Sequence, residues 1–306
     1  MDTILAQGLT RRFGDLAAVD GLTLAVAESE IFGLVGPDGA GKTTTMRLLT
    51  GILAPTSGEA WVDGLPIGTE ADRIKDRIGY MSQRFGLYPD LTVLENLDFY
   101  ADLYEVPRRG REEKVERLLA FSNLAPFKRR QAGNLSGGMK QKLGLACALV
   151  HTPRVLFLDE PTNGVDPVSR RDFWRILYQL LKERVTIFVS TAYLDEAERC
   201  SRIGLMHAGK LLACDTVDGV KGLMKGVLLE VRCPGARQAG AALREADLGS
   251  VALFGDRLHI VVQDEEDGRA RIAAALRAAG LPSAEIRPVE PSLEDVFTSA
   301  LPGGGH

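Results

Sequence analysis

The segment that most constrains this chain is a glycine-rich loop matching the pattern G-x-x-x-x-G-K-[ST]. It directly follows a branched apolar run, Ile31–Val35, and precedes a stretch expected to be helical from about Lys42. Glycines let backbone N–H groups approach phosphate oxygens, and the helix N-terminus adds partial positive charge. A chance glycine-rich turn is the alternative, which this strand and helix context disfavours. The loop predicts a nucleotide-binding segment made of Gly36, Pro37, Asp38, Gly39, Ala40, Gly41, Lys42, Thr43 and Thr44.

Three short apolar runs predict the strands of a parallel sheet: Ile31–Val35, Val155–Leu158 and Val185–Val189. None alternates strictly with polar residues, as expected for strands buried on both faces. In open α/β sheets, ligands bind at the carboxyl ends of the strands. The fold class indicated is α/β, with a P-loop NTPase core.

Two adjacent acids, Asp159 and Glu160, follow the second apolar run. At the same sheet edge as the loop, Asp159 is expected to orient Mg²⁺ with Thr43, and Glu160 to act as the general base on water. Lys42 is expected on the β- and γ-phosphates of ATP. Adjacent carboxylates are usually only solvated, but the apolar run before them and the loop upstream argue against that here.

The chain of 306 residues is long enough for two domains. We predict a nucleotide-binding domain over 1–221, whose helical subdomain spans about 90–150, a small α+β domain over 222–302 and a flexible tail over 303–306. In the subdomain, Asp90, Thr92 and Glu95 mark a helix start. Further helices are predicted over Arg111–Leu119 and Met139–Val150. The small domain is read as Val227–Val231 (strand), Ala236–Ala246 (helix), Val251–Phe254 and Leu258–Val262 (hairpin), Gly268–Ala279 (helix) and Ile286–Pro288 (strand).

Composition excludes some classes of function. A net charge of -4 gives no basic surface for nucleic acid, so no nucleic-acid partner is expected. No apolar stretch reaches the ~20 residues that cross a bilayer, and Met1–Ile4 lacks the basic start of a secretion signal. Four scattered cysteines suit a reducing compartment, with Cys147 expected in the core. A membrane function would need another chain for the membrane part.

The segment Leu135-Ser136-Gly137-Gly138 resembles the signature of ABC ATPases, and it lies about twenty residues before the acidic pair. Ser136 can cap the following helix, and the two glycines let the helix N-terminus approach an anion closely. An ordinary capped helix does not explain the double glycine. In the family, that anion is the γ-phosphate of ATP bound to the other subunit.

The resemblance extends over about residues 3–221. It implies that Phe13 stacks on adenine, that Gln83 senses Mg²⁺ and γ-phosphate, and that Asp166 belongs to the D-loop between subunits. Phe85–Tyr88 would face a transmembrane partner. In detail the chain is similar to ABC-2 exporter ATPases, especially the first half of a tandem ATPase associated with drug export. This implies a second ATPase and membrane permease subunits as partners, at the inner face of the cell membrane.

One position departs from the family pattern, because Ala192 in Ser190-Thr191-Ala192-Tyr193 stands where the switch histidine is normal. A methyl group cannot hydrogen-bond the γ-phosphate or the attacking water, and such a loss typically slows chemistry by about 10²–10³-fold. None of the four histidines (His151, His207, His259, His306) is expected to compensate. We therefore expect an asymmetric dimer, in which this chain's own site turns over slowly and its signature completes the partner's site. An introduced inactivating substitution is the alternative explanation, although Glu160, a more usual target, is intact.

Two other functions stay open at this point. A non-transport ABC protein acting on ribosomes or DNA usually carries two nucleotide domains or a long coiled coil, and neither pattern is present. A regulatory subunit that binds nucleotide without turnover is favoured by Ala192 and disfavoured by the intact Glu160 and Gln83.

Overall fold

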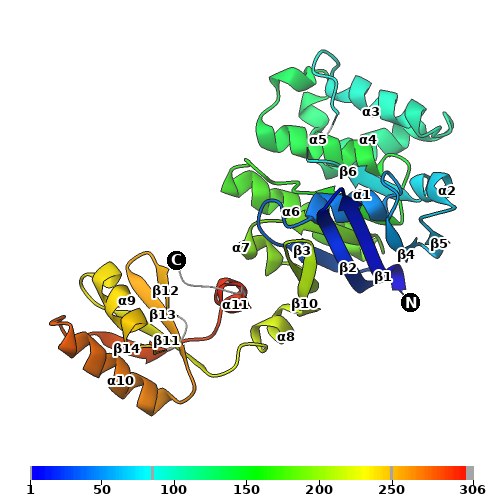
Figure 1. Cartoon of the computed structure of the whole chain (residues 1–306). Coiled ribbons are helices and arrows are strands. Elements are labelled where there is room, and N and C mark those ends of the chain that lie inside the picture. Colours follow the sequence, from blue (N-terminus) through cyan, green and yellow to red (C-terminus); the bar gives the residue numbers. More distant parts are fainter. Residues whose placement is uncertain (1, 84–85, 249–250, 301–306) are drawn as a thin grey trace. The chain divides into compact units, whose positions relative to one another are not determined.

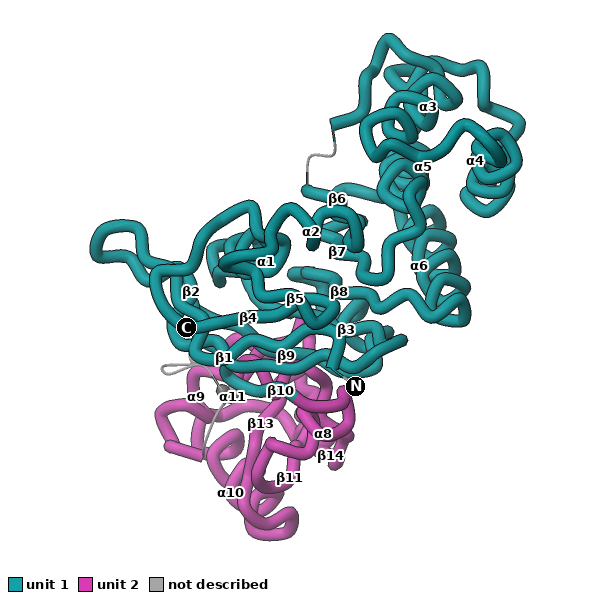
Figure 2. The backbone as a smooth tube through the Cα atoms, turned by 90° about the vertical axis from the view of Figure 1, so that its right-hand side faces the viewer, with its two compact units in different colours: residues 1–214 teal, residues 215–306 magenta. Residues whose placement is uncertain are grey.

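The computed structural model describes residues 2–83, 86–248 and 251–300, and the chain forms two compact units, Met1–Cys214 and Asp215–His306 (Figures 1 and 2). The boundary expected after residue 221 falls later than this division, so helix α8 (Val217–Lys221) is part of the second unit. Phe85 and the tail over 303–306 lie outside the described residues.

The centre of unit 1 is a six-stranded sheet with the order β10-β9-β3-β8-β7-β6. The three predicted strands are adjacent and parallel at its centre, and almost every residue in them is buried. That burial on both faces explains why their sequences do not alternate. The strands are β3 (Ile31–Val35), β6 (Ile78–Met81), β7 (Val155–Asp159), β8 (Thr186–Thr191), β9 (Arg202–His207) and β10 (Lys210–Thr216).

A second sheet in unit 1, absent from the sequence prediction, has the order β2-β1-β4-β5 and antiparallel pairing. Its inward-facing residues, such as Leu22, Leu24 and Val26, alternate with exposed ones and join the core. Its first strand ends at Phe13, the residue predicted to stack on adenine. Its strands are β1 (Asp2–Phe13), β2 (Leu16–Ala27), β4 (Ser57–Val62) and β5 (Leu65–Pro66).

Helix α1 (Lys42–Leu49) begins at Lys42, as predicted, and packs Met46 and Leu49 into the core with Phe157 and Phe188. The other helices beside the large sheet are α2 (Ala71–Lys75), α6 (Pro167–Lys182) and α7 (Leu194–Ala197).

The helical subdomain lies beyond β6, away from the β1–β2 sheet (Figure 1). Its first helix starts with the predicted cap, where Thr92 Oγ1 accepts from Glu95 N at 3.2 Å and Glu95 Oε2 accepts from Thr92 N at 2.7 Å. The central helix is buried over most of its length, including Cys147, because other elements surround it. The helices are α3 (Val93–Leu103), α4 (Arg111–Phe121) and α5 (Gly137–Leu149), with short 3-10 turns at Ala125–Phe127 and Ala132–Asn134.

Between α8 and a last helix, α11 (Leu293–Ala300), unit 2 has the element order βαββαβ. Its antiparallel sheet has the order β12-β13-β11-β14, which is the ferredoxin-like arrangement. The predicted succession of elements is confirmed, including the Gly255-Asp256 turn. One helix begins earlier than expected, at Glu265, because Asp264 caps it by accepting from Asp267 N at 2.9 Å. The elements are β11 (Val227–Arg232), α9 (Ala236–Glu245), β12 (Val251–Phe254), β13 (Arg257–Val262), α10 (Glu265–Ala278), β14 (Glu285–Pro288) and α11 (Leu293–Ala300).

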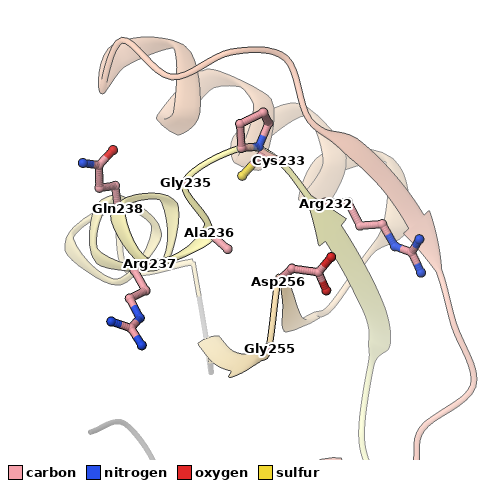
Figure 3. Close-up of a pocket in the computed structure, with 9 residues that line it drawn as sticks. Arg232, Cys233, Gly235, Ala236, Arg237, Gln238, Gly255 and Asp256 are labelled. Atoms are coloured by element: carbon pink, nitrogen blue, oxygen red, sulfur yellow. The ribbon is translucent and has the colours of Figure 1, made fainter.

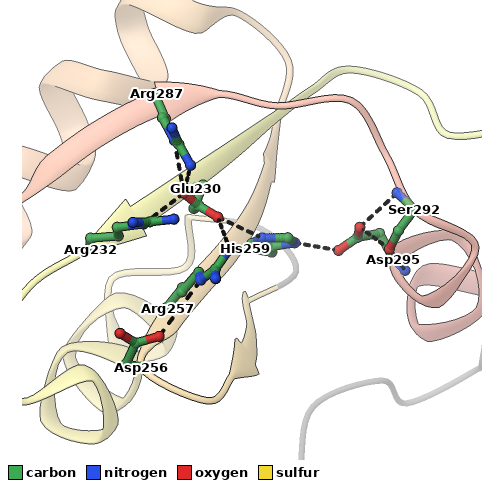
Figure 4. Close-up of polar contacts among 8 residues, drawn as sticks. All are labelled: Glu230, Arg232, Asp256, Arg257, His259, Arg287, Ser292 and Asp295. Carbon is green, nitrogen blue, oxygen red and sulfur yellow. Dashed lines mark hydrogen bonds and ion pairs between the residues drawn. The ribbon is translucent and has the colours of Figure 1, made fainter. Parts of the chain in front are cut away.

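The two faces of this sheet differ in chemistry. Leu229, Val231, Leu258 and Ile260 form an apolar core with α9 and α10. The opposite face holds Glu230, which is only 3% exposed although it carries a carboxylate (Figure 4).

Three guanidinium groups hold Glu230 at nitrogen–oxygen distances of 2.7–3.0 Å, and they belong to Arg232, Arg257 and Arg287. Burial opposes the charge of Glu230, but hydrogen bonds from the three arginines outweigh it and lower its pKa to about 2. Glu230 is therefore ionised at neutral pH.

Helix α11 is tied to the same polar face through His259. Its Nδ1 lies 2.6 Å from Asp295 Oδ1, and its Nε2 lies 3.6 Å from Glu230 Oε2. The hydrogen bond with Asp295 raises the pKa of His259, although burial opposes this. For Asp295, burial favours the neutral form, but hydrogen bonds from His259 and Ser292 lower its pKa overall. The His259–Asp295 pair therefore favours the charged form of both groups.

Candidate functional site

The glycine loop turns from β3 into α1 in a space that excludes side chains. A Cβ on Gly36 would lie 2.1 Å from Met206 O, and one on Gly41 would lie 2.3 Å from Ala18 O. Gly41 also has φ +105°, which other residues rarely adopt. Lys42 is only 4% exposed, and its Nζ donates to Gly36 O at 2.8 Å and Pro37 O at 2.9 Å. These two hydrogen bonds hold the lysine ammonium above the start of the glycine loop.

A hollow of about 550 Å³ opens over this loop. Phe13 is 48% exposed in its wall, with the Arg11 guanidinium 4.7 Å from its ring centroid. The hollow is large enough for a nucleotide-sized ligand. It brings together residues predicted from distant parts of the sequence: Phe13, Asp38, Gly39, Ala40, Gly41, Lys42, Thr43, Thr44, Gln83 and Glu160.

Asp159, at the end of β7, lies beside Thr43. Its Oδ1 accepts from Thr43 Oγ1 at 3.1 Å and from Ser190 Oγ at 2.7 Å. Its Oδ2 is buried and has no hydrogen-bond partner among the residues that the structure describes. This unpaired carboxylate oxygen and the nearby Thr43 hydroxyl are oxygen ligands of the kind that Mg²⁺ prefers. The predicted metal-binding pair therefore fits a magnesium ion.

Glu160 follows Asp159 with a left-handed backbone, φ 47°, which costs energy in a residue with a side chain. Its N–H donates to Ser190 Oγ at 3.0 Å. Its Oε1 lies 3.2 Å from Lys42 Nζ, and its Oε2 accepts from Gln83 Nε2 at 3.0 Å. The structure thus brings three predicted residues into one contact group.

Ala192 lies in the wall of a neighbouring hollow of about 250 Å³, which it shares with Asp38 and Glu160. Asn163 and Tyr193 line the same hollow. Neither residue was predicted as part of the site.

The signature residues lie elsewhere on unit 1. Ser136 caps α5 as predicted, since its Oγ accepts from Met139 N at 3.3 Å. Leu135 is buried, Gly137 is exposed, and Gly138 packs so closely on α6 that an added Cβ would lie 2.4 Å from Ser169 Cβ. Among the described residues lining the hollow over Lys42, none comes from this segment. The structure therefore does not bring the signature to the chain's own phosphate loop.

Asp166, the predicted D-loop residue, caps α6. Its Oδ1 accepts from Ser169 N at 2.9 Å and Val168 N at 3.1 Å. The backbone hydrogen bond from Ser169 is the main reason that the pKa of Asp166 is lowered. This aspartate stays charged at neutral pH and is exposed.

Unit 2 has a hollow of about 750 Å³, which the sequence did not indicate (Figure 3). Arg232 comes from the end of β11, Asp256 from the hairpin turn and Gly235 from the start of α9. Cys233 is its potential nucleophile, but burial raises the pKa of that thiol, which keeps it protonated at neutral pH. The hollow in unit 1 is therefore the better candidate for chemistry.

Residues 19–163 match the sequence profile of a family described as ABC transporter. The chain is 43% identical over 310 residues to the probable multidrug ABC transporter ATP-binding protein YbhF of Escherichia coli (strain K12). That match covers 99% of this chain and 52% of the relative, so the chain spans about half of its length.

A second relative matches along most of its length. The chain is 35% identical over 297 residues to the daunorubicin resistance ATP-binding protein DrrA3 of Streptomyces coeruleorubidus, covering 96% of this chain and 94% of the relative. Among solved structures, the dimeric ATP-binding cassette MJ0796 in a post-hydrolysis state with ADP and Pi has 25% identity and a TM-score of 0.63. It covers 70% of this chain and 98% of that one.

Proposed function

Because the chain belongs to the ABC transporter family of ATP-binding proteins, we propose that it is an ATP-hydrolysing motor subunit of an ABC-2 type exporter. The names of two relatives, a multidrug transporter protein and a daunorubicin resistance protein, favour export, including export of drugs. One observation carries the proposal: Glu160 contacts both Lys42 and Gln83 in a hollow that Phe13 also lines, and Asp159 lies next to Thr43 of the same hollow.

The residues suggest a division of roles at this site. Phe13 offers its exposed face to the adenine ring, and the loop N–H groups with Lys42 bind the phosphates. Thr43 and Asp159 would hold Mg²⁺, and Gln83 would contact it when nucleotide is bound. The ion, when bound, neutralises charge on the β- and γ-phosphates.

Glu160 is the proposed general base, because one of its oxygens can accept a proton from a water beside the γ-phosphate. In this structure its carboxylate pairs with Lys42. When phosphate oxygens compete for that ammonium, Glu160 Oε1 becomes free to face the water. Nucleotide binding would therefore release the base.

We propose that two such subunits or domains sandwich the nucleotide, with Leu135, Ser136, Gly137 and Gly138 of one completing the loop of the other. This is supported by the absence of these four residues from the described lining of the chain's own hollow and by the capped helix N-terminus at Ser136. Asp166 caps α6, the helix whose Ser169 packs on Gly138, and we expect Asp166 to lie along the same interface. Membrane permease subunits are the further partners, at the inner face of the membrane. No helix among the described residues is long and apolar enough to pass through a bilayer.

Ala192 motivates the finer proposal of an asymmetric dimer in which this chain's own site turns over slowly. The measurement is the ATP hydrolysis rate of the wild-type chain, Ala192→His and Glu160→Gln. We expect Ala192→His to raise kcat by about 10²-fold and Glu160→Gln to bind ATP without hydrolysis. If the histidine leaves the rate unchanged, the slow-site proposal is wrong. If the wild type binds ATP with no turnover above Glu160→Gln, the chain is a regulatory nucleotide-binding subunit instead.

A mixing experiment tests the sandwich. Lys42→Ala removes the phosphate ligand, whereas Gly137→Asp places a negative charge where the partner's γ-phosphate would lie. Gly137 suits this test, because an added Cβ there has no neighbour within 4 Å. Each variant alone should be inactive, and a mixture should regain activity, because one composite site is intact. Inactivity of the mixture, despite dimer formation, would exclude the shared site.

A further inference from the structure

Two residues beside the proposed general base have no role in the function proposed so far. Asn163 Nδ2 donates to Glu160 Oε2 at 3.3 Å, and Tyr193 OH donates to Asn163 Oδ1 at 3.3 Å. Because the Tyr193 hydroxyl donates to the amide oxygen of Asn163, the amide NH₂ on the other side of the group is directed toward Glu160. The two hydrogen bonds thus form a chain from Tyr193 to the carboxylate.

Tyr193 is itself held from two sides. Its backbone N donates to Thr191 Oγ1 at 3.0 Å, at the end of β8. The Arg170 guanidinium lies 4.5 Å from its ring centroid, a cation–π contact. A tyrosine fixed in this way can orient its hydroxyl without losing much side-chain freedom on binding.

The contacts that hold Tyr193 are in turn connected to the core by Glu196, which is almost completely buried. Arg170 Nε lies 3.3 Å from Glu196 Oε1, and Thr191 Oγ1 donates to Glu196 Oε2 at 2.8 Å. Thr162, next to Asn163, also donates to Glu196 Oε1. Tyr193 and Asn163 are therefore both connected, through neighbouring residues, to the buried carboxylate of Glu196.

We propose that Asn163 and Tyr193 are positioning residues that hold Glu160 toward the attacking water in a site where Ala192 supplies no hydrogen bond. This inference depends on the proposed ATP hydrolysis. Once Lys42 pairs with phosphate, the side-chain donors that Glu160 keeps among the described residues are neutral amides, those of Gln83 and Asn163. The amide of Asn163 then limits where Oε2 can point, and Tyr193 limits where the amide can point.

The decisive variant is Tyr193→Phe, which keeps the ring over Arg170 and removes only the hydroxyl. We expect kcat for ATP to fall about 10-fold, with KM and the affinity for a fluorescent ATP analogue unchanged, since one orienting hydrogen bond is lost. Asn163→Ala should show the same pattern. The matched control is Tyr178→Phe. Tyr178 lies toward the C-terminal end of α6, and its hydroxyl donates to Arg199 O at 3.1 Å, so its loss should leave kcat at the wild-type value.

The histidine background separates positioning from a structural role. In Ala192→His, the imidazole supplies a hydrogen bond of its own, so adding Tyr193→Phe should lower kcat less than about 3-fold. An equal loss in both backgrounds, or a changed KM at constant kcat, would overturn the inference. Single-turnover assays with γ-labelled ATP resolve the slow rates. Absence of any wild-type turnover refutes the proposed function as well, whereas turnover that Tyr193→Phe leaves intact refutes the positioning role alone.

Discussion

Replacing Glu230 by glutamine should weaken unit 2 selectively. Glu230 is 3% exposed, and it is the shared counter-ion of three arginines on β11, β13 and β14. Removing one partner of a buried ion pair typically costs about 3–5 kcal/mol. These arginine side chains are 40–49% exposed, so water can rehydrate part of their charge. We therefore expect a loss of about 2 kcal/mol, since exposure reduces the value of an ion pair.

The chain provides its own assay for this prediction. Trp61 and Trp174, its two tryptophans, both lie in unit 1, so tryptophan fluorescence reports that unit. Far-UV circular dichroism reports the helices and strands of both. For a unit of this size, about 2 kcal/mol corresponds to a fall in Tm of roughly 10 °C. Glu230→Gln should lower a circular dichroism transition by that amount and leave the fluorescence transition in place.

Glu245→Gln, in exposed sequence at the end of α9, is the matched control and should shift neither transition. If Glu230→Gln moves the fluorescence transition equally, the two units unfold together and the argument from local charge is wrong. If it moves neither, the three arginines tolerate one another without Glu230, and the expected loss of about 2 kcal/mol is refuted.

Three further predictions concern pH, packing and metal. The pKa of His259 is raised by its hydrogen bond with Asp295, and the pKa of Asp295 is lowered by its hydrogen bonds with His259 and Ser292. The difference in the free energy of unfolding between the wild type and His259→Asn should therefore be largest at about pH 4–6.5, where both groups are charged. Urea titrations should show it shrinking as pH rises through the raised His259 pKa or falls through the lowered Asp295 pKa. Gly138→Ala forces a Cβ to 2.4 Å from Ser169 and should lower the fluorescence-detected Tm by several degrees, whereas an unchanged Tm would mean that α5 and α6 can separate freely. Thr43→Ala should raise the Mg²⁺ concentration needed for half-maximal ATPase activity about 10-fold, and an unchanged requirement would remove Thr43 from the metal site.

Much of the fold was predictable because burial leaves a direct trace in sequence. The runs Ile31–Val35 and Val155–Leu158 are apolar at every position except Gly33, and the structure buries all of them. The long strand β1 left no such trace, since Thr10, Arg11 and Arg12 interrupt it and its pairing with β2 shifts register several times. Local patterns cannot reveal strands whose hydrogen bonds depend on bulges and on distant partners.

The candidate site shows the same limit. The loop glycines, Lys42 and the acidic pair could be predicted as site residues because their proposed chemistry needs a fixed local spacing. Ser190 and Tyr193 were missed because their contacts, with Asp159 and Asn163 respectively, arise only when β8 lies beside β7. Asn163 contacts Glu160 from only three residues away, but it belongs to no motif whose spacing marks it. A signal did exist for Ser190: it stands at the carboxyl end of the third predicted strand, and the register pairs it with Asp159.

The backbone of Glu160 carries one more consequence, for how this protein can change over time. A side chain at φ 47° is tolerated rather than preferred, and glycine at that position would relax the turn. Selection for thermal stability alone would thus favour replacing Glu160, the proposed general base, by glycine. Screens for more stable variants should therefore measure Tm and turnover together, because at residue 160 a change that raises Tm is expected to lower turnover.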